Sequence, residues 1–294
     1  MNMREHKNMS GRIPEDSFLR CTPIAHRGLH NISQGIQENT YPAFQRAVDQ
    51  GVAIETDIHL TADDELVLFH DINLEAITGD TRPIGDYTLA ELKAVSLTKN
   101  GEKIPEFKEF LRFIDGRVPL LLELKWSHRR KTLVSKVLES LNEYKGEFAM
   151  QSFDPRIVHL IKKMAPDILR GQLACTHTEY ANRFVDWILK KMPLNFINKP
   201  DFVNYNVSDL PKQLKTAKRA RGTLLLGWTV RTLEELMRTR EYLDNIVFEY
   251  LSKAVMEKYS QLVKNVSATD YSDYYSDYMF ATSADLSGRS DINF

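Results

Sequence analysis

Apolar and polar residues follow one another along this chain in two kinds of segment. Short apolar runs of strand length recur between stretches with helical patterns. Segments that alternate in this way predict a parallel α/β fold. The strand-length runs are Thr22–His26, Val52–Ile58, Leu120–Leu124, Phe148–Ser152, Ile168–Leu173, Phe202–Asn206, Leu224–Val230 and Ile246–Phe248.

Helices are predicted between these strands. Asn39 is the candidate N-cap of a helix over Tyr41–Gln50, and Gly51 is its candidate end. Eight strand and helix units over about 245 residues match the usual size of a (β/α)8 barrel, roughly 250 residues. Further helices are predicted near Phe107–Ile114, Thr132–Asn142, Pro155–Met164, Pro211–Arg219 and Leu233–Leu243.

The predicted fold class is therefore an α/β TIM barrel, with a doubly wound open sheet as the alternative. The glycine-rich phosphate turn of a dinucleotide fold is missing after the first strand, where His26-Arg27-Gly28 stands. Only the turn Thr61–Glu65 separates the run Leu66–Phe69 from the second strand, and five residues cannot hold a crossover helix. We expect this run to return as a hairpin and to bring His70 opposite Asp57.

Three regions are expected along the chain. Residues 1–20 form an N-terminal arm, residues 21–265 form the barrel with a small insertion at about 71–118, and residues 266–294 form a polar tail that is expected to be disordered. The first twenty residues lack a signal-peptide pattern, and no run reaches the roughly 18 to 20 apolar residues of a membrane span. A cytoplasmic protein is expected.

Composition limits the partners. The 39 basic residues nearly cancel the 40 acidic ones, so no strong overall field recruits nucleic acid or an anionic membrane, and a small-molecule substrate is favoured. Cys21 and Cys175 lack metal-ligand spacing and are expected to be free thiols. The segment Tyr180–Pro200, rich in aromatic residues and lysine, is expected to cover the barrel, with peripheral contact to a lipid surface as the alternative. The oligomeric state stays open.

Acidic residues gather at the predicted strand ends. Glu55 and Asp57 are two apart in one strand and so face one side, and Glu123 and Lys125 share this relation in the third strand. Three carboxylates suit a hard divalent cation, Mg²⁺ or Ca²⁺, better than Zn²⁺, and Arg27 and Lys125 would neutralise phosphate oxygens. A lone Glu-x-Asp pair is more often a solvated edge or an ion pair, but three converging strand ends favour a metal site.

Two histidines stand at predicted carboxyl ends of strands, where barrel active sites lie. His26 and His70 are each followed by a charged residue, and phosphodiester cleavage needs an acid and a base near neutral pH. Trp228 offers either a flat wall to a substrate or plain core packing. The histidines interpreted as structural or surface groups are His30, His59, His128, His159 and His177.

These residues resemble the glycerophosphodiester phosphodiesterases. The resemblance covers about Pro23 to Glu249 and implies a (β/α)8 barrel that uses a divalent cation to hydrolyse glycerophosphodiesters to sn-glycerol 3-phosphate and an alcohol, in lipid and glycerol metabolism. The matching blocks follow in the family's order: Ile24-Ala25-His26-Arg27-Gly28, Glu38-Asn39-Thr40-Tyr41-Pro42-Ala43-Phe44, Glu55-Thr56-Asp57, Phe69-His70-Asp71, Glu123-Leu124-Lys125, Gln151-Ser152-Phe153 and Trp228-Thr229-Val230.

The resemblance also implies a role for each matching residue. His26 and His70 would be the acid and the base, Arg27 and Lys125 would bind the phosphate, and Glu38 would orient Arg27 or the metal-bound water. The implied metal ligands are Glu55, Asp57 and Glu123.

The chain departs from the family at two positions. The last strand ends in Phe248-Glu249 where the family usually has Thr-Asp, so the contact at the rim is either kept through the longer side chain or lost. Gln151 replaces a frequent Ser, which either narrows the pocket or adds a hydrogen bond to the substrate.

Two other functions stay open. One is a lysophospholipase D that acts on lipid substrates with the same metal and histidines but needs an apolar groove. The other is a non-catalytic barrel that binds a phosphate ligand or a partner; the intact pair of His26 and His70 argues against it.

Overall fold

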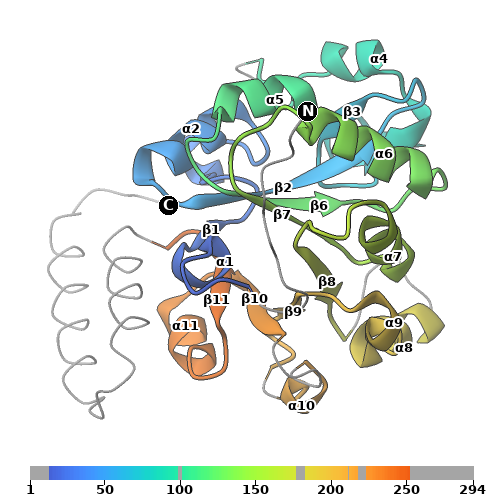
Figure 1. The fold of residues 1–294 in the computed structure, drawn as a ribbon. Coiled ribbons are helices and arrows are strands. Elements are labelled where there is room, and N and C mark those ends of the chain that lie inside the picture. The colour runs from blue at the N-terminus through green and yellow to red at the C-terminus, as the bar shows by residue number, and fades with distance from the viewer. Residues whose placement is uncertain (1–12, 99–100, 177–182, 211, 218–222, 252–294) are drawn as a thin grey trace, which may run out of the picture. The chain divides into compact units, whose positions relative to one another are not determined.

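The computed structural model describes residues 13–98, 101–176, 183–210, 212–217 and 223–251. Within this part of the chain, eight parallel strands pair in sequence order, and the first strand pairs with both the second and the last, so the sheet closes into the predicted barrel (Figure 1). The barrel strands are β1 (Ile24–Ala25), β2 (Ala53–Leu60), β6 (Leu120–Leu124), β7 (Phe148–Ser152), β8 (Arg170–Ala174), β9 (Phe202–Asn206), β10 (Leu224–Val230) and β11 (Asn245–Phe248).

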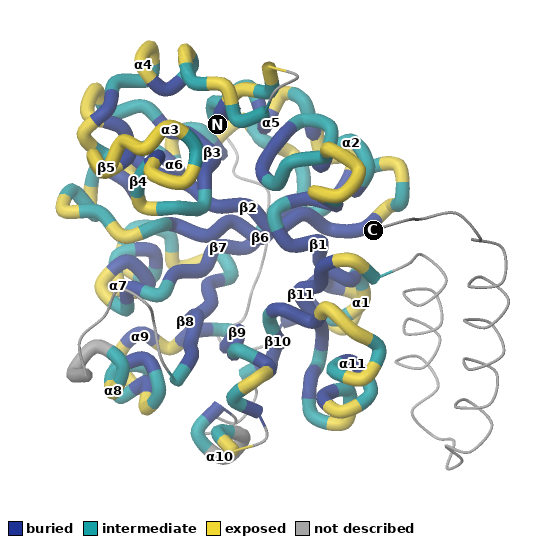
Figure 2. The backbone as a smooth tube through the Cα atoms, turned by 180° about the vertical axis from the view of Figure 1, so that it is seen from behind, coloured by how far each residue is buried: buried dark blue, intermediate teal, exposed yellow. Residues whose placement is uncertain are grey.

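The strands are buried almost throughout, as Figure 2 shows by their dark colour. Every residue of β2 and of β6 is buried. This explains why β6 is apolar except for Glu123, since a parallel sheet is covered on both faces, whereas β2 buries the polar residues Glu55, Thr56, Asp57 and His59 among its apolar ones. Four predicted strands match the observed bounds: β6, β7, β9 and β10.

Helices surround the barrel in Figure 1. Three predictions match closely, for α2, α5 and α7, whereas α11 ends four residues before the predicted Leu243. The prediction Pro211–Arg219 lies partly outside the described residues. The helices of the ring are α2 (Tyr41–Gln50), α5 (Phe107–Ile114), α6 (Arg130–Leu141), α7 (Pro155–Met164), α8 (Arg183–Lys191), α9 (Asn195–Asn198), α10 (Leu214–Ala217) and α11 (Leu233–Thr239).

The two ends of α2 test the predicted capping residues. Gly51 ends the helix as expected, with a φ of 65° and its N–H donating to the carbonyl of Ala47. The prediction that Asn39 is the N-cap is wrong. Thr40 holds that position, and it makes no side-chain capping bond. The Asn39 side chain instead reaches into the barrel and bonds to Asp57.

The predicted hairpin and insertion follow β2. The strand β3 (Leu66–Leu68) runs antiparallel to β2, with Leu68 opposite Ile58, so the hairpin prediction is confirmed. The segment beyond it has a small apolar core of its own that includes Leu74, Ile84 and Leu92. Its elements are β4 (Asn73–Leu74), α3 (Glu75–Thr78), β5 (Asp80–Pro83), the 3₁₀ helix η2 (Ile84–Asp86) and α4 (Leu89–Ala94).

The described part of the N-terminal arm packs against the amino-terminal end of the barrel. Ile13, Phe18 and Leu19 are buried in one cluster with the first residues of several strands, and Phe18 begins the short helix α1 (Phe18–Cys21). The barrel belongs to a compact unit, Met1–Met256. The tail at 266–294 lies outside the described residues.

Two expectations about the whole chain concern cysteines and membranes. Cys21 is exposed, Cys175 is buried, and they form no disulfide with each other. Among the described helices, none is long and apolar enough to cross a membrane. The cytoplasmic location stays a prediction.

Candidate active site

Three carboxylates meet at the carboxyl ends of β2 and β6. Asp57 lies opposite Glu123 in the parallel register, and Glu55 precedes Asp57 on the same side of β2. All three are buried, and each offers an oxygen atom within 4.8 Å of the others. Burial and the charges of Asp57 and Glu123 raise the pKa of Glu55 well above its usual value. The cluster therefore carries more negative charge than its surroundings favour.

Lys125 neutralises part of this charge. Its Nζ lies 3.1 Å from Asp57 Oδ1 and 2.9 Å from Glu123 Oε1. Burial alone would raise the pKa of Asp57, but the nearby charges of Lys125, His70 and Arg27 hold it well below its usual range. Asp57 is therefore ionised near neutral pH.

The turn after β1 brings Arg27 to the carboxylates. Arg27 has a φ of 55°, and Gly28 has a φ of 76°, where a Cβ would lie 3.0 Å from atoms of Ala43 and Phe44. The Arg27 backbone N–H donates to Glu55 Oε2 at 3.1 Å, and its Nη1 donates to both oxygens of Glu38 at 2.8 and 2.9 Å. Glu38 thus contacts Arg27, and the orienting role expected of it stays a prediction.

Asn39 secures the position of Asp57. Its Nδ2 donates to Asp57 Oδ2 at 2.9 Å, and its Oδ1 accepts from Thr56 Oγ1 at 2.7 Å, all within the buried interior. Asn39 has a φ of 51°, a left-handed conformation that asparagine tolerates better than most residues. A turn residue thus becomes a support for a carboxylate of the cluster.

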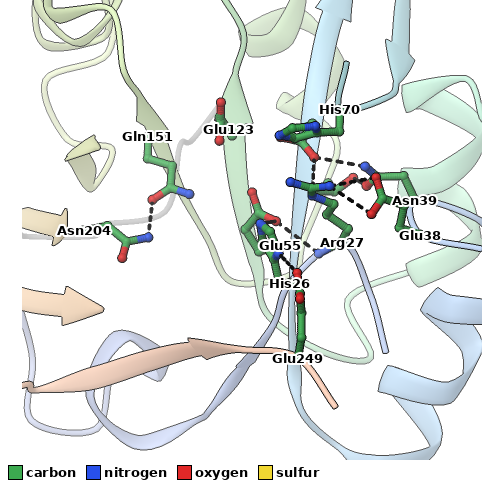
Figure 3. Close-up of polar contacts among 12 residues, drawn as sticks. His26, Arg27, Glu38, Asn39, Glu55, His70, Glu123, Gln151, Asn204 and Glu249 are labelled. Atoms are coloured by element: carbon green, nitrogen blue, oxygen red, sulfur yellow. Dashed lines mark hydrogen bonds and ion pairs between the residues drawn. The ribbon is translucent and has the colours of Figure 1, made fainter. Parts of the chain in front are cut away.

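His26 lies between the carboxylate cluster and the last strand. Its Nε2 is 3.9 Å from Glu55 Oε2, and its Nδ1 forms a short hydrogen bond with Glu249 Oε1, as Figure 3 shows. Burial lowers the pKa of His26 to about 4, although the hydrogen bond and charge of Glu249 oppose this shift. The ring is neutral near pH 7, and Glu249 favours the tautomer with the proton on Nδ1.

Glu249 was not among the predicted site residues. Its other oxygen, Oε2, accepts from Arg231 Nε at 2.7 Å, and Oε1 lies 3.8 Å from Nε2 of the buried His30. Glu249, which stands where the family usually has Asp, therefore still contacts residues at the rim of the barrel. The sequence marked Glu249 as unusual, but only the closure of β11 against β1 brings it to His26.

His70 stands on the returning arm of the hairpin. The Phe69 N–H donates to the Asp57 carbonyl at 3.1 Å, which fixes the end of β3 at the same rim as the carboxylates. His70 Nδ1 is 2.8 Å from Asp71 Oδ1, and about a third of its side chain is exposed, at 33%. Unlike His26, it is open to solvent.

Gln151 lies on β7, beside Glu123 in the register of β6 and β7, and Trp228 lies on β10, which pairs with β11. Trp228 Nε1 donates to the Asn204 carbonyl at 3.2 Å, and its ring meets that of Phe153 edge to face at 5.5 Å. Gln151 Oε1 accepts from Asn204 Nδ2 at 3.0 Å, so in this structure its carbonyl oxygen is used within the barrel. Trp228 also packs on the apolar core, and its role toward a substrate stays a prediction.

Residues 26–249 match the Glycerophosphoryl diester phosphodiesterase family. A protein of Caldanaerobacter subterraneus subsp. tengcongensis named Glycerophosphodiester phosphodiesterase is 29% identical over 232 residues, which cover 75% of this chain and 90% of that protein. A rat protein named Lysophospholipase D is 31% identical over 137 residues, 42% of each chain.

Solved structures share the fold. A putative glycerophosphoryl diester phosphodiesterase from Silicibacter pomeroyi superposes with a TM-score of 0.69 at 24% identity, over 82% of this chain and 96% of that one. An Oleispira antarctica phosphodiesterase, solved with the product sn-glycerol-3-phosphate, superposes with a TM-score of 0.67 at 23% identity, over 80% and 95%.

Proposed function

This chain belongs to the glycerophosphoryl diester phosphodiesterase family, and we propose that it hydrolyses glycerophosphodiesters to sn-glycerol 3-phosphate and an alcohol. The observation that carries the proposal is the buried cluster of Glu55, Asp57 and Glu123 beside His26. The relative solved with sn-glycerol-3-phosphate as its product supports the same reaction. The substrate is a small molecule.

The donor set of the cluster fits a hard divalent cation. Three carboxylates within 4.8 Å provide only oxygen ligands, which Mg²⁺ and Ca²⁺ prefer. The raised pKa of Glu55 reflects negative charge that a bound cation would neutralise. When bound, the cation would stabilise negative charge on the phosphoryl oxygens.

The cationic side chains bind and orient the phosphate. Arg27 and Lys125 both touch the carboxylate cluster, so an anion beside that cluster lies within their reach. Glu38 holds the Arg27 guanidinium through two hydrogen bonds, which limits the orientations available to it. We assign Trp228 the role of a wall for the glycerol backbone.

The two histidines divide the proton transfers. His26 is neutral, and its Nδ1–H donates a hydrogen bond to Glu249. Its unprotonated Nε2 is therefore free to accept the proton of the attacking hydroxyl. His70, supported by Asp71, donates a proton to the departing alkoxide. The attacking group is either the neighbouring glycerol hydroxyl, which gives a cyclic phosphate first, or water, which gives none.

A lysolipid substrate is the second candidate. It is favoured by the match to the rat protein named Lysophospholipase D. The same carboxylates and histidines would serve, because the reacting phosphodiester is the same.

The test is release of glycerol 3-phosphate from glycerophosphocholine and glycerophosphoethanolamine with Mg²⁺, Ca²⁺ or EDTA. We expect release only with metal, and a loss of at least about a hundredfold in His26→Ala. His159→Ala, which removes an exposed histidine, is the matched control and should keep full activity. Phosphorus NMR during the reaction distinguishes a cyclic intermediate from direct attack by water. Absence of release from either substrate by folded, metal-loaded protein contradicts the proposal, and lysolipids are then tested.

A further inference from the structure

A groove of about 670 Å³ lies on the outside of the barrel, between the first turns of α6 and α7 and the short helix α9. We call it the basic groove. None of the described residues that line it is acidic. Its cationic and titratable lining residues are His128, Arg129, Arg130, Lys131, Arg156 and His159.

Positive charge exceeds negative charge around the basic groove. Arg129 pairs with Asp64, and Arg130 and Arg156 share Asp154 at 2.7 and 2.8 Å. Within the described part of the chain, Lys131 forms no ion pair, and its side chain is exposed. Four permanent cations thus face two carboxylates. The near-zero net charge of the whole chain conceals this local excess.

Apolar side chains accompany the charges. Leu160, Leu194 and Ile197 line the groove. Two large apolar side chains stand close to these lining residues in the chain: Phe196, on α9, is 75% exposed, and Trp126, two residues before His128, is 49% exposed. The Trp126 ring lies 4.3 Å from the ring of His128, within the same segment. The exposure of large apolar groups to water is unfavourable, and a second surface that covers them recovers this free energy.

We propose that the basic groove docks this protein on a membrane that contains anionic phospholipids. Cations attract the phosphate head groups, while exposed aromatic side chains enter the boundary between head groups and acyl chains. A soluble phosphate would engage the cations but leave Phe196 and Trp126 in water, so the combination favours a bilayer.

The position of the basic groove suits this role. His128 follows Lys125 by three residues, and Pro155 begins α7 three residues after β7 ends. The groove therefore starts at the carboxyl ends of β6 and β7, which is the face that carries Glu123. Docking there would hold the barrel mouth close to the lipid surface. The proposal concerns binding, and its test does not depend on catalysis.

Co-sedimentation with vesicles tests the proposal. The probes are vesicles of phosphatidylcholine alone and of about three parts phosphatidylcholine to one part phosphatidylglycerol. We expect binding to the anionic vesicles only, weakening as salt rises. Lys131→Glu should weaken binding by roughly five- to thirtyfold, since each charge near an anionic surface contributes about fivefold. Phe196→Ser should weaken it about tenfold, whereas Phe196→Trp should retain it.

Lys145→Glu is the matched control, because Lys145 is also exposed but lies beyond the other end of α6. Thermal denaturation of each variant confirms that the fold is retained. Equal loss in Lys131→Glu and Lys145→Glu would overturn the proposal, because only net charge would matter. Unchanged vesicle binding by Phe196→Ser, or equal binding of the intact protein to neutral vesicles, would overturn it too.

Discussion

Removal of the Glu249 carboxylate gives a direct measure of how far His26 depends on its buried partner. In Glu249→Ala, the Nδ1 of His26 loses its hydrogen-bond acceptor in a site where His26 is only 7% exposed. A buried donor without a partner costs about 1–3 kcal/mol, and a ring free to rotate no longer aims Nε2 at the reacting hydroxyl. We expect kcat to fall between about fivefold and a hundredfold or more.

The kcat of Glu249→Gln should lie between that of Glu249→Ala and that of the unmodified protein. The amide oxygen still accepts a hydrogen bond from His26, but the charge is lost and Arg231 faces a neutral group. A charge-assisted bond is about twice as strong as a neutral one, so the loss of kcat is expected to be about half as large, on a logarithmic scale, as that in Glu249→Ala. Arg231→Gln is the control. The Arg231 side chain is 51% exposed and contacts Oε2 of Glu249, not the oxygen that faces His26. The kcat of Arg231→Gln should therefore stay within about threefold of that of the unmodified protein.

The assay is steady-state hydrolysis of glycerophosphocholine at saturating metal, with kcat and KM determined separately. Glu249 is not one of the three clustered carboxylates, so KM should stay constant while kcat falls. Thermal denaturation reports any loss of folding. A Glu249→Ala protein that is folded and retains kcat within about twofold would refute the positioning role, as would a raised KM with unchanged kcat.

Two further predictions concern the supports of the barrel rim. Asn39→Gly keeps the left-handed backbone but removes the hydrogen bond to Asp57, so metal affinity measured by calorimetry should fall about 10- to 100-fold; an unchanged affinity would contradict the support. Asp154→Asn tests the N-cap of α7. Burial alone would raise the pKa of Asp154, but hydrogen bonds from Arg156 and Arg130 hold it below its usual 3.8. Because the folded-state pKa is depressed, the carboxylate stabilises the fold above about pH 4, and this contribution is lost as the pH falls through the folded-state pKa. In urea denaturation, Asp154→Asn should therefore lower the free energy of unfolding by about 1–3 kcal/mol at pH 7 and by less near pH 3. An equal loss of stability at both pH values would rule out the charge of Asp154 as the cause.

The fold was readable from local patterns, because buried parallel strands and amphipathic helices each leave a regular signature. The carboxylate cluster was also predictable, since two of its members are two apart on one strand and the third is the last residue but one of the next barrel strand. The hairpin placed His70 for a similar reason. Its turn is too short for any other connection.

The supports of the cluster were not predictable by these means. Asn39 has the residue type and position of a helix cap, and only the tertiary contact with Asp57 decides its side-chain direction. Glu249 was visible as a departure, but its partner lies 223 residues earlier in the chain. His128 was interpreted as a structural or surface group because it does not stand at a predicted strand end, and the basic groove forms only where α7 and α9 fold against the start of α6.

The bond between His26 and Glu249 crosses the seam where the first and last barrel strands meet. During synthesis, the ribosome delivers His26 early and Glu249 only after the rest of the barrel, so a nascent chain holds an unsupported histidine until its last strand emerges. Premature termination anywhere before Glu249 leaves that histidine without its carboxylate. Catalytic competence thus reports the completion of the barrel, and partly made chains are expected to be inactive even where their early strands have already folded.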